Sequence, residues 1–288
     1  MNGIIIIDKP TGWTSHDVVA KLRGILKTKR IGHGGTLDPM ATGVLPVFAG
    51  RATRAAEFCE NAEKEYIAGL RLGLVTDTQD VTGNTLSKSD ASFALEDINA
   101  VIPQFLGAQK QVPPMYSAIK IDGKKLYEIA RRGGEIQRPA RDIFISEIEL
   151  LGGNENEFSL RIACSKGTYI RTLCHDFGAA LGCGGTMSSL RRIRAGAFTI
   201  EMARTLDELL AAVSGGRIDS DIIPVDTIFS GYPAIELNEA DSRRCRNGAP
   251  CRLDGASDGT YRFYGTDNEF IALCEVRSSV TRIIKSFS

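Results

Sequence analysis

The chain has 288 residues, 43% of them hydrophobic, and its 35 basic residues equal its 35 acidic ones. This length exceeds that of a usual single domain and favours two domains, or one large domain with an appendage. The zero formal net charge gives no reason to expect a polyanionic partner, so the distribution of the charges along the chain must decide that question.

The cysteines and the N-terminus indicate where the protein works. Seven cysteines occur without a CxxC pair, and an odd number without paired spacing is typical of reduced thiols rather than of a disulfide framework. The four consecutive isoleucines at residues 4–7 are too short for a signal peptide or a membrane span. We therefore expect a soluble, cytoplasmic protein that does not associate with membranes.

The first fifty residues predict a strand, a helix and a loop. Residues 3–7 form a buried strand that stops at a turn over residues 8–12. A helix follows, with Ser15 as its N-cap and apolar residues at helical spacing over residues 18–26. Five glycines and two prolines after Ile31 then predict a loop up to residue 50, with no continuous helix or strand.

The middle of the chain mixes strand and helix patterns. Thr168 is predicted to cap a helix that Gly182 ends. The absence of a regular βαβ alternation favours an α+β fold. The predicted strands are residues 66–74, followed by a turn at 76–84, and residues 138–151 and 157–164, which form a hairpin.

The last sixty residues differ in composition from the rest. The change near residues 230–233 predicts a domain boundary. Short segments at 259–264, 270–276 and 280–285, separated by glycine, aspartate and asparagine, predict a small β-rich appendage.

The histidines and one cysteine do not form a familiar site. His16, His33 and His175 have no metal-ligand spacing, so we expect no metal site. The run Cys174-His175-Asp176 contains the residue types of a thiol triad. Consecutive helix residues point in different directions, so we interpret Cys174 as a packed side chain beside two surface residues.

Two other chemistries lack support in the sequence. The phosphate-binding patterns GxGxxG and GxxxxGK[ST] are absent, so we expect no nucleotide cofactor. Asp77 and Asp80 do not have the spacing of an EF-hand, and turn formation explains both of them better than calcium binding.

One loop contains a single charged side chain. Between Gly32 and Val47 only Asp38 carries a formal charge, in a stretch that Pro39 and Pro46 constrain and that its glycines leave open to close approach. A generic Asp-Pro pair is an Asx turn, and that interpretation stays open. The surroundings favour a reactive carboxylate that the loop holds in place.

The same loop resembles a family signature. The pattern G-H-x-G-x-L-D-P-x-A-T-G-x-L-P, at residues 32–46, is similar to that of the TruB family of tRNA pseudouridine synthases. The resemblance continues, in the family's order, through DKPTGWTS, YIAGLRLGLVTDTQD, PPMYSAIKIDGKKLYEIARRG, KGTYIRTL and LRRIRAG, and it covers roughly the first two hundred residues.

The resemblance implies a fold and a reaction. The fold is that of pseudouridine synthases, a mixed, largely antiparallel sheet flanked by helices in a catalytic domain over residues 1–230, with a small PUA-like RNA-binding domain over residues 231–288. The reaction converts uridine 55 in the T-loop of tRNA to pseudouridine, through cleavage of the N-glycosidic bond, rotation of the base and formation of a C5–C1′ bond. An isomerisation needs no cofactor, and the base must be flipped out of the loop. We expect a monomer whose partner is the tRNA T-arm.

The resemblance also implies catalytic roles. Asp38 matches the family's nucleophile, which attacks either the uracil ring or the ribose C1′. Arg171 matches the arginine that pairs with this aspartate. Tyr66 matches the tyrosine that stacks on the uracil and takes part in the proton transfer from C5. His33 matches the histidine that stacks into the disrupted T-loop.

Further residues match the substrate-binding parts of the family. A basic segment at residues 110–141 has eight basic and three acidic residues and matches the family's RNA-clamping segment, although some of its charges also fit a solvated helix face. Arg191 and Arg192 suit contact with backbone phosphates. The remaining expected substrate-binding residues are Lys9, Pro10, Leu190, Tyr169, Lys166, Lys124, Lys125, Arg131 and Arg132.

Two alternatives stay open. A guide-RNA-dependent relative that modifies ribosomal RNA usually has longer lysine-rich ends and a larger PUA domain. Loss of Asp38, Tyr66 or Arg171 would indicate a non-catalytic RNA-folding protein on the same scaffold, and all three residues are present.

Overall fold

The computed structural model describes residues 1–90, 92–117, 119–121 and 123–288. It confirms an α+β fold with largely antiparallel sheets. The chain forms two compact units. Unit 1 is Met1–Pro39, Leu45–Glu60 and Glu201–Ser288, and unit 2 is Met40–Val44 and Asn61–Ile200. Across the described ranges, no helix has the length and apolar character needed to cross a membrane.

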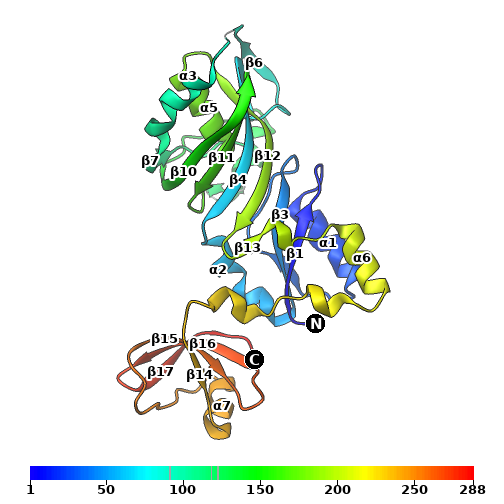
Figure 1. The fold of residues 1–288 in the computed structure, drawn as a ribbon, viewed down its shortest axis with the longest axis vertical. Helices are drawn as coiled ribbons and strands as arrows, with labels where there is room; N and C mark the ends of the chain where they lie inside the picture. Colours follow the sequence, from blue (N-terminus) through cyan, green and yellow to red (C-terminus); the bar gives the residue numbers. More distant parts are fainter. Residues whose placement is uncertain (91, 118, 122) are drawn as a thin grey trace. The chain divides into compact units, whose positions relative to one another are not determined.

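Unit 2 is built on a twisted sheet of long strands (Figure 1). Strands β12, β4, β11, β10 and β7 are antiparallel neighbours in that order, and β12 also pairs in parallel with Thr42 and Gly43 at the start of β3. Helix α5 packs against β12 and β4, and α3 packs against β10. The strands of this sheet that lie wholly or partly in unit 2 are β3 (Thr42–Ala49), β4 (Lys64–Leu72), β7 (Gly107–Gln111), β10 (Arg141–Asn154), β11 (Glu157–Cys164), β12 (Gly185–Ala195) and β13 (Phe198–Thr199). The other elements of unit 2 are β5 (Leu74–Thr76), β6 (Thr85–Lys88), α3 (Leu95–Val101), η2 (Ile102–Phe105), β8 (Lys120–Ile121), β9 (Lys124–Lys125), α4 (Leu126–Ala130) and α5 (Ile170–Ala180).

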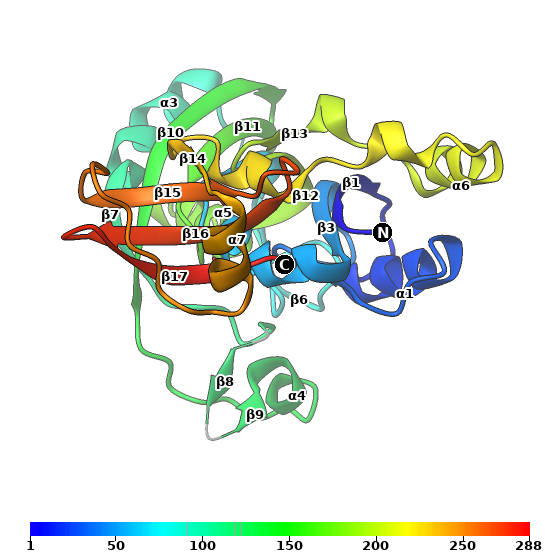
Figure 2. The same cartoon turned by 90° about the horizontal axis from the view of Figure 1, so that it is seen from below.

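The basic segment forms a small lobe of unit 2. Strands β8 and β9 pair as a short hairpin, and helix α4 follows directly. Figure 2 shows these three elements projecting away from the sheet, joined to it by extended connections. We call β8, β9 and α4, together with the residues up to 132, the clamp segment.

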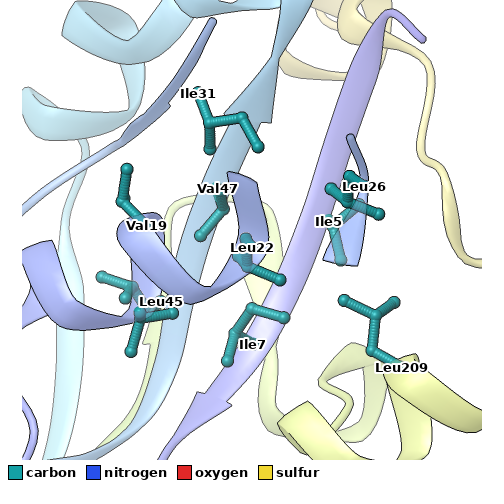
Figure 3. Packing of buried hydrophobic residues seen from close by; sticks show 10 residues of the cluster. Ile5, Ile7, Val19, Leu22, Leu26, Ile31, Leu45, Val47 and Leu209 are labelled. Carbon is teal, nitrogen blue, oxygen red and sulfur yellow. The ribbon is translucent and has the colours of Figure 1, made fainter. Parts of the chain in front are cut away.

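The N-terminal part of unit 1 packs around β1 (Figure 3). Ile5 and Ile7 of β1 contact Leu22 of α1, Leu45 of β3 and Leu209 of α6 in one buried cluster. Strand β1 also forms backbone bridges to two residues late in the chain, from Ile4 to residue 223 and from Ile7 to residue 204. These elements are β1 (Gly3–Lys9), α1 (Ser15–Ile25), β2 (Ile31–His33), η1 (Gly50–Ala55), α2 (Ala56–Glu60), η3 (Ile200–Met202), α6 (Leu206–Ser214), η4 (Ile218–Asp221) and η5 (Val225–Phe229).

The C-terminal residues form a separate four-stranded sheet with its own buried cluster. Three of its strands confirm the predicted segments. Phe229 makes aromatic contacts with Phe58 (4.9 Å between ring centroids), Phe270 (5.8 Å) and Phe287 (5.6 Å). The division at residues 230/231 stays a prediction. The elements are β14 (Ala234–Glu236), α7 (Glu239–Arg246), β15 (Gly259–Tyr264), β16 (Phe270–Arg277) and β17 (Val280–Ser286).

Three local predictions were wrong. The N-cap of α1 is Thr14 rather than Ser15, because Thr14 and Asp17 form a reciprocal capping box. The N-cap of α5 is Tyr169, and the hydroxyl of Thr168 donates to the Ser165 carbonyl instead. The predicted loop over residues 31–50 contains the buried strand β3, because packing in the core stabilises an extended conformation despite the glycines and prolines.

Candidate active site

Both neighbours of Asp38 are anchored by hydrogen bonds to the start of the chain. The Leu37 amide donates to the Ser15 hydroxyl at 2.9 Å, and that hydroxyl donates to the Leu37 carbonyl at 3.3 Å. On the other side, the Gly12 amide donates to the Pro39 carbonyl at 2.8 Å. Asp38 is half-buried between these two fixed points. Ser15, predicted as a helix cap, therefore holds the loop of the candidate nucleophile.

Lys9 contributes a third anchor to this loop. Its side chain is fully buried, and its ammonium group donates to the carbonyls of Pro10 (2.9 Å), Trp13 (2.5 Å) and Pro39 (3.2 Å). Buried ammonium groups require such acceptors, and three of them satisfy the three N–H donors of a lysine. The structure thus places Lys9 beneath the loop as a positioning residue, and Pro10 is half-buried beside it.

His33 lies at the end of β2, five residues before Asp38. Its ring contacts that of His16 edge to face, with 5.3 Å between the centroids and an interplanar angle of 79°. The Gly34 amide donates to the Pro46 carbonyl at 2.9 Å, which continues the pairing of β2 with β3. Unit 1 therefore carries Lys9, Pro10, His33 and Asp38 on neighbouring segments.

Tyr66 and Leu190 lie on adjacent strands of unit 2. Tyr66 of β4 pairs with Arg192 of β12, and Ala68 pairs with Leu190. Residues two apart on a strand share a face, so Tyr66 and Leu190 are diagonal neighbours on the same face of the sheet. Their exposed fractions are 9% and 8%, respectively. This pairing brings the predicted stacking tyrosine and the predicted apolar lining residue together.

Arg171 lies in the first turn of α5 with its guanidinium group buried. It donates to the carbonyls of Thr78 at 3.2 Å and Tyr116 at 2.8 Å. Its Nη1 lies 3.6 Å from Oδ2 of Asp80, and the two side chains are 6% and 7% exposed. Asp80 therefore supplies a carboxylate that holds Arg171 within unit 2.

Asp80 is a site residue that the sequence reasoning assigned only to a turn. The turn role is confirmed, because Asp80 Oδ1 accepts from the Thr82 amide at 3.0 Å and from the Thr78 hydroxyl at 2.9 Å. The ion pair with Arg171 was missed. The spacing of the two acids in the stretch YIAGLRLGLVTDTQD does not distinguish them, whereas in the structure Asp80 is buried and Asp77 is half-buried.

Comparison with known proteins identifies the family. Residues 23–170 match the N-terminal domain of TruB family pseudouridylate synthases, and residues 171–230 match the tRNA pseudouridylate synthase B C-terminal domain. The chain belongs to the TruB family. A tRNA pseudouridine synthase B of Clostridium kluyveri is 40% identical over 100% of both chains, and one of Clostridium tetani is 43% identical over 99% of both. In a solved H/ACA RNP bound to a substrate RNA containing 2′-deoxyuridine, one chain is 26% identical with a TM-score of 0.76, over 99% of this chain and 85% of that one.

One residue that the TruB resemblance led us to expect on the RNA surface is buried. Arg192 is 1% exposed, and its Nε donates to the Val44 carbonyl at 2.7 Å. This burial contradicts the predicted phosphate contact, because a side chain without exposed donors does not reach a phosphate at the surface. Arg191, the preceding residue on β12, is half-buried, and its Nη1 donates to the Thr42 hydroxyl at 3.3 Å.

The TruB motif KGTYIRTL spans the turn before α5, at residues 166–169, and the first turn of that helix. Lys166 is exposed, and its ammonium group donates to Asn61 Oδ1 at 2.7 Å. Tyr169 is held at its backbone by Gln111, whose amide nitrogen donates to the Tyr169 carbonyl at 3.0 Å and whose oxygen accepts from the Tyr169 amide at 2.8 Å. This pair fixes the start of the helix that carries Arg171.

The clamp segment arranges two of its cations around one aromatic ring. The Lys125 ammonium group donates to the Tyr127 hydroxyl at 3.2 Å and lies 5.4 Å from the ring centroid, and this contact raises the pKa of Lys125. The Arg131 guanidinium group is also 5.4 Å from that centroid. Lys124 and Arg132 are exposed. The predicted contact residues thus lie together on one lobe, separate from the strands of Tyr66 and Leu190.

The thiol-triad alternative fails in this TruB chain. Cys174 is completely buried, and this burial raises the pKa of its thiol to about 12. A thiol that stays protonated is a poor nucleophile. Cys174 therefore belongs to the core, as predicted, whereas His175 and Asp176, which were predicted at the surface, are half-buried.

Proposed function

We propose that this chain converts uridine 55 in the T-loop of tRNA to pseudouridine. The observation that carries the proposal is the loop of Asp38. The residues on both sides of this carboxylate are fixed to β1, to the following turn and to α1 through Lys9, Gly12 and Ser15, respectively. Such anchoring preorganises a nucleophile and is not needed for an ordinary Asx turn. Full-length relatives named tRNA pseudouridine synthase B support the choice of reaction.

The proposed reaction breaks one bond and forms another within the substrate. The N1–C1′ bond is cleaved, the uracil rotates while the enzyme retains it, a C5–C1′ bond forms, and the proton on C5 is lost as N1 gains one. No electron or group carrier is consumed. Asp38 acts as the nucleophile and forms a covalent bond to either the ribose C1′ or the uracil ring between cleavage of the N1–C1′ bond and formation of the C5–C1′ bond.

Tyr66 and Arg171 support this chemistry in our proposal. Tyr66, with Leu190 beside it on the sheet, stacks on the flipped uracil and takes part in the removal of the C5 proton. Burial beside a flipped base raises the pKa of a carboxylic acid unless a cation opposes it. Arg171 is the cation that keeps the nucleophile ionised, and Asp80 fixes its position.

The T-arm of tRNA is the proposed partner, bound by a monomer. His33 stacks into the opened T-loop, the exposed cations of the clamp segment contact phosphates, and the residues from 231 onward form a PUA-like RNA-binding domain. The relatives at 40% and 43% identity favour a tRNA substrate over the guide-RNA alternative, since the H/ACA RNP chain is 26% identical. Seven free cysteines suit a reducing compartment, so we place the reaction in the cytoplasm.

The nucleophile assignment is tested with Asp38→Asn. Asparagine keeps the shape of the side chain but cannot attack, so tRNA binding is expected to persist while single-turnover conversion falls by roughly 10³-fold or more. Asp90→Asn, at an exposed acid of unit 2, is the control. The measurements are pseudouridine formation in a T-arm stem-loop with enzyme in excess, and a filter-binding titration. Conversion by Asp38→Asn within about tenfold of wild type would return Asp38 to the Asx-turn interpretation.

A further inference from the structure

Unit 2 contains a cavity that the proposed reaction does not use. It has a volume of about 210 Å³ and lies among η2, β7, β10 and α5. Its floor is apolar, formed by the buried side chains of Ile143, Ile145 and Leu173. At about 30 Å³ for each water molecule in the liquid, this volume equals that of about seven waters.

An acidic residue occupies a core-facing position of α5 at this cavity. Leu173, Asp176 and Ala180 follow each other at spacings of three and four, so they share one face of the helix, and all three line the cavity. Burial raises the pKa of Asp176, and the neighbouring His175 opposes this effect. Within the described part of the chain, no side chain or amide donates a hydrogen bond to the Asp176 carboxylate or forms an ion pair with it.

The lysine that lines the cavity is already engaged elsewhere. Lys110 lines the cavity, but its ammonium group lies 2.9 Å from Oδ1 of Asp142, at the exposed side of β7 and β10. The Asp176 carboxylate is therefore a half-buried anion in a partly apolar space, with no ion pair to any described residue. Burying a carboxylate without a counterion or hydrogen-bond donor lowers the stability of the fold.

A glutamine contributes a second open acceptor. Gln109 pairs with Ile143 in the sheet and lines the cavity at a position where a buried face normally carries an apolar residue. Its amide nitrogen donates to the carbonyls of Gln104 at 3.1 Å and Leu106 at 3.0 Å. These bonds fix the amide, and no donor among the described residues reaches its Oε1. Of the other two lining glutamines, Gln111 uses both ends of its amide on the backbone of Tyr169, and Gln104 is exposed.

We propose that this cavity binds a small aliphatic ammonium ion of the diamine class, with Asp176 and Gln109 as its hydrogen-bond acceptors. Among the described lining residues, the wall offers the Asp176 carboxylate and Gln109 Oε1 as open acceptors, beside the exposed amide of Gln104, and this suits a ligand that carries N–H donors. The apolar floor suits a short methylene chain, and the ring of Phe105 at the rim adds an aromatic surface that attracts cations. The site does not depend on the proposed function.

The test is a titration of the full-length chain, free of RNA, with 1,4-diaminobutane at low ionic strength, followed by calorimetry. We expect saturable binding of one molecule per chain. Asp176→Asn keeps the side-chain shape and removes the charge, so its affinity should fall at least tenfold. Asp90→Asn makes the same change in net charge at an exposed position of the same unit and should leave the affinity within twofold of wild type.

Two further measurements keep the proposal open to refutation. Butane-1,4-diol has the same length without charge and should not bind. Gln109→Met retains the volume of the glutamine and removes the second acceptor, so it should weaken binding even if Asp176→Asn fails to fold, which circular dichroism would reveal. The proposal is overturned if wild type shows no saturable binding, if folded Asp176→Asn binds as tightly as wild type, or if the diol binds as well as the diamine.

Discussion

Replacing Asp80 with asparagine separates the two roles of this residue. The carboxylate lies 3.6 Å from the Arg171 guanidinium group, and both side chains are less than a tenth exposed. At an effective dielectric constant of about 20 this separation corresponds to an attraction of about 4–5 kcal/mol, part of which desolvation cancels. Removing one partner of such a pair leaves the other charge buried, which costs about 3–5 kcal/mol. Asparagine retains the acceptor for the Thr82 amide, so we expect the lower end, about 3 kcal/mol.

Asp77 in the same turn provides the matched control. Its exposed carboxylate accepts from the backbone and side chain of Asn84 at 2.8 and 3.0 Å. Asp77→Asn should therefore cost less than about 1 kcal/mol, the range for surface substitutions that keep a turn. Asp80→Asn should also slow single-turnover pseudouridine formation at least tenfold, because Arg171 loses the group that fixes it. Urea unfolding and the single-turnover assay check these expectations. Equal losses of stability and activity in Asp77→Asn and Asp80→Asn would show that the turn, not the ion pair, matters.

Three further predictions concern binding, the loop and the thiols. Alanine at the four predicted contact residues of the clamp segment should weaken tRNA binding. The slope of log affinity against log salt concentration should fall in magnitude by about one unit for each phosphate that is no longer neutralised, and an unchanged slope in filter binding would contradict this. Lys9→Met should lower the free energy of unfolding by about 3 kcal/mol, because three buried carbonyls lose their donor, and an unaltered urea midpoint would argue against that anchor. Burial raises the pKa of Cys174 to about 12, so its thiol stays protonated at about pH 8.5 and should resist iodoacetamide in the folded protein while the less buried Cys183 reacts. Mass spectrometry that finds Cys174 labelled before Cys183 would contradict this prediction. Any part of the free energy of unfolding that depends on the protonated Cys174 thiol should be lost as the pH rises toward 12.

The strand predictions succeeded for the continuous apolar run of β1 and for strands with one buried and one exposed face. The hairpin of β10 and β11 was found because its alternation and its polar turn agree, and the C-terminal strands were found in the same way. Strand β3 was missed because its glycine and proline content reports only the local conformational preference of the backbone. Its strand conformation depends on burial against neighbouring elements. Pro46 lies within β3 and still contributes its carbonyl to the Gly34 amide.

The site was predictable to the extent that it is local in sequence. Asp38 and its anchors lie within the first forty residues, so the density of glycine and proline around one acid indicated a constrained loop. The pairing of Asp80 with Arg171 joins segments about ninety positions apart, and turn spacing carries no information about that contact. The basic run on β12 was misread at Arg192, because successive strand residues point to opposite faces and one of two adjacent arginines must point inward.

The discontinuity of unit 1 has a consequence for synthesis on the ribosome. Strand β1 emerges first, yet its bridges run to residues 204 and 223, and Leu209 completes the cluster around Ile5 and Ile7. Most of unit 2 is one uninterrupted stretch and can acquire its sheet while the part of β1 that later contacts Leu209 and residues 204 and 223 still lacks those partners. Contacts of such long sequence separation form late and leave hydrophobic surface exposed in the meantime. The isoleucine run at the start of the chain is therefore the segment that we expect a nascent-chain chaperone to bind.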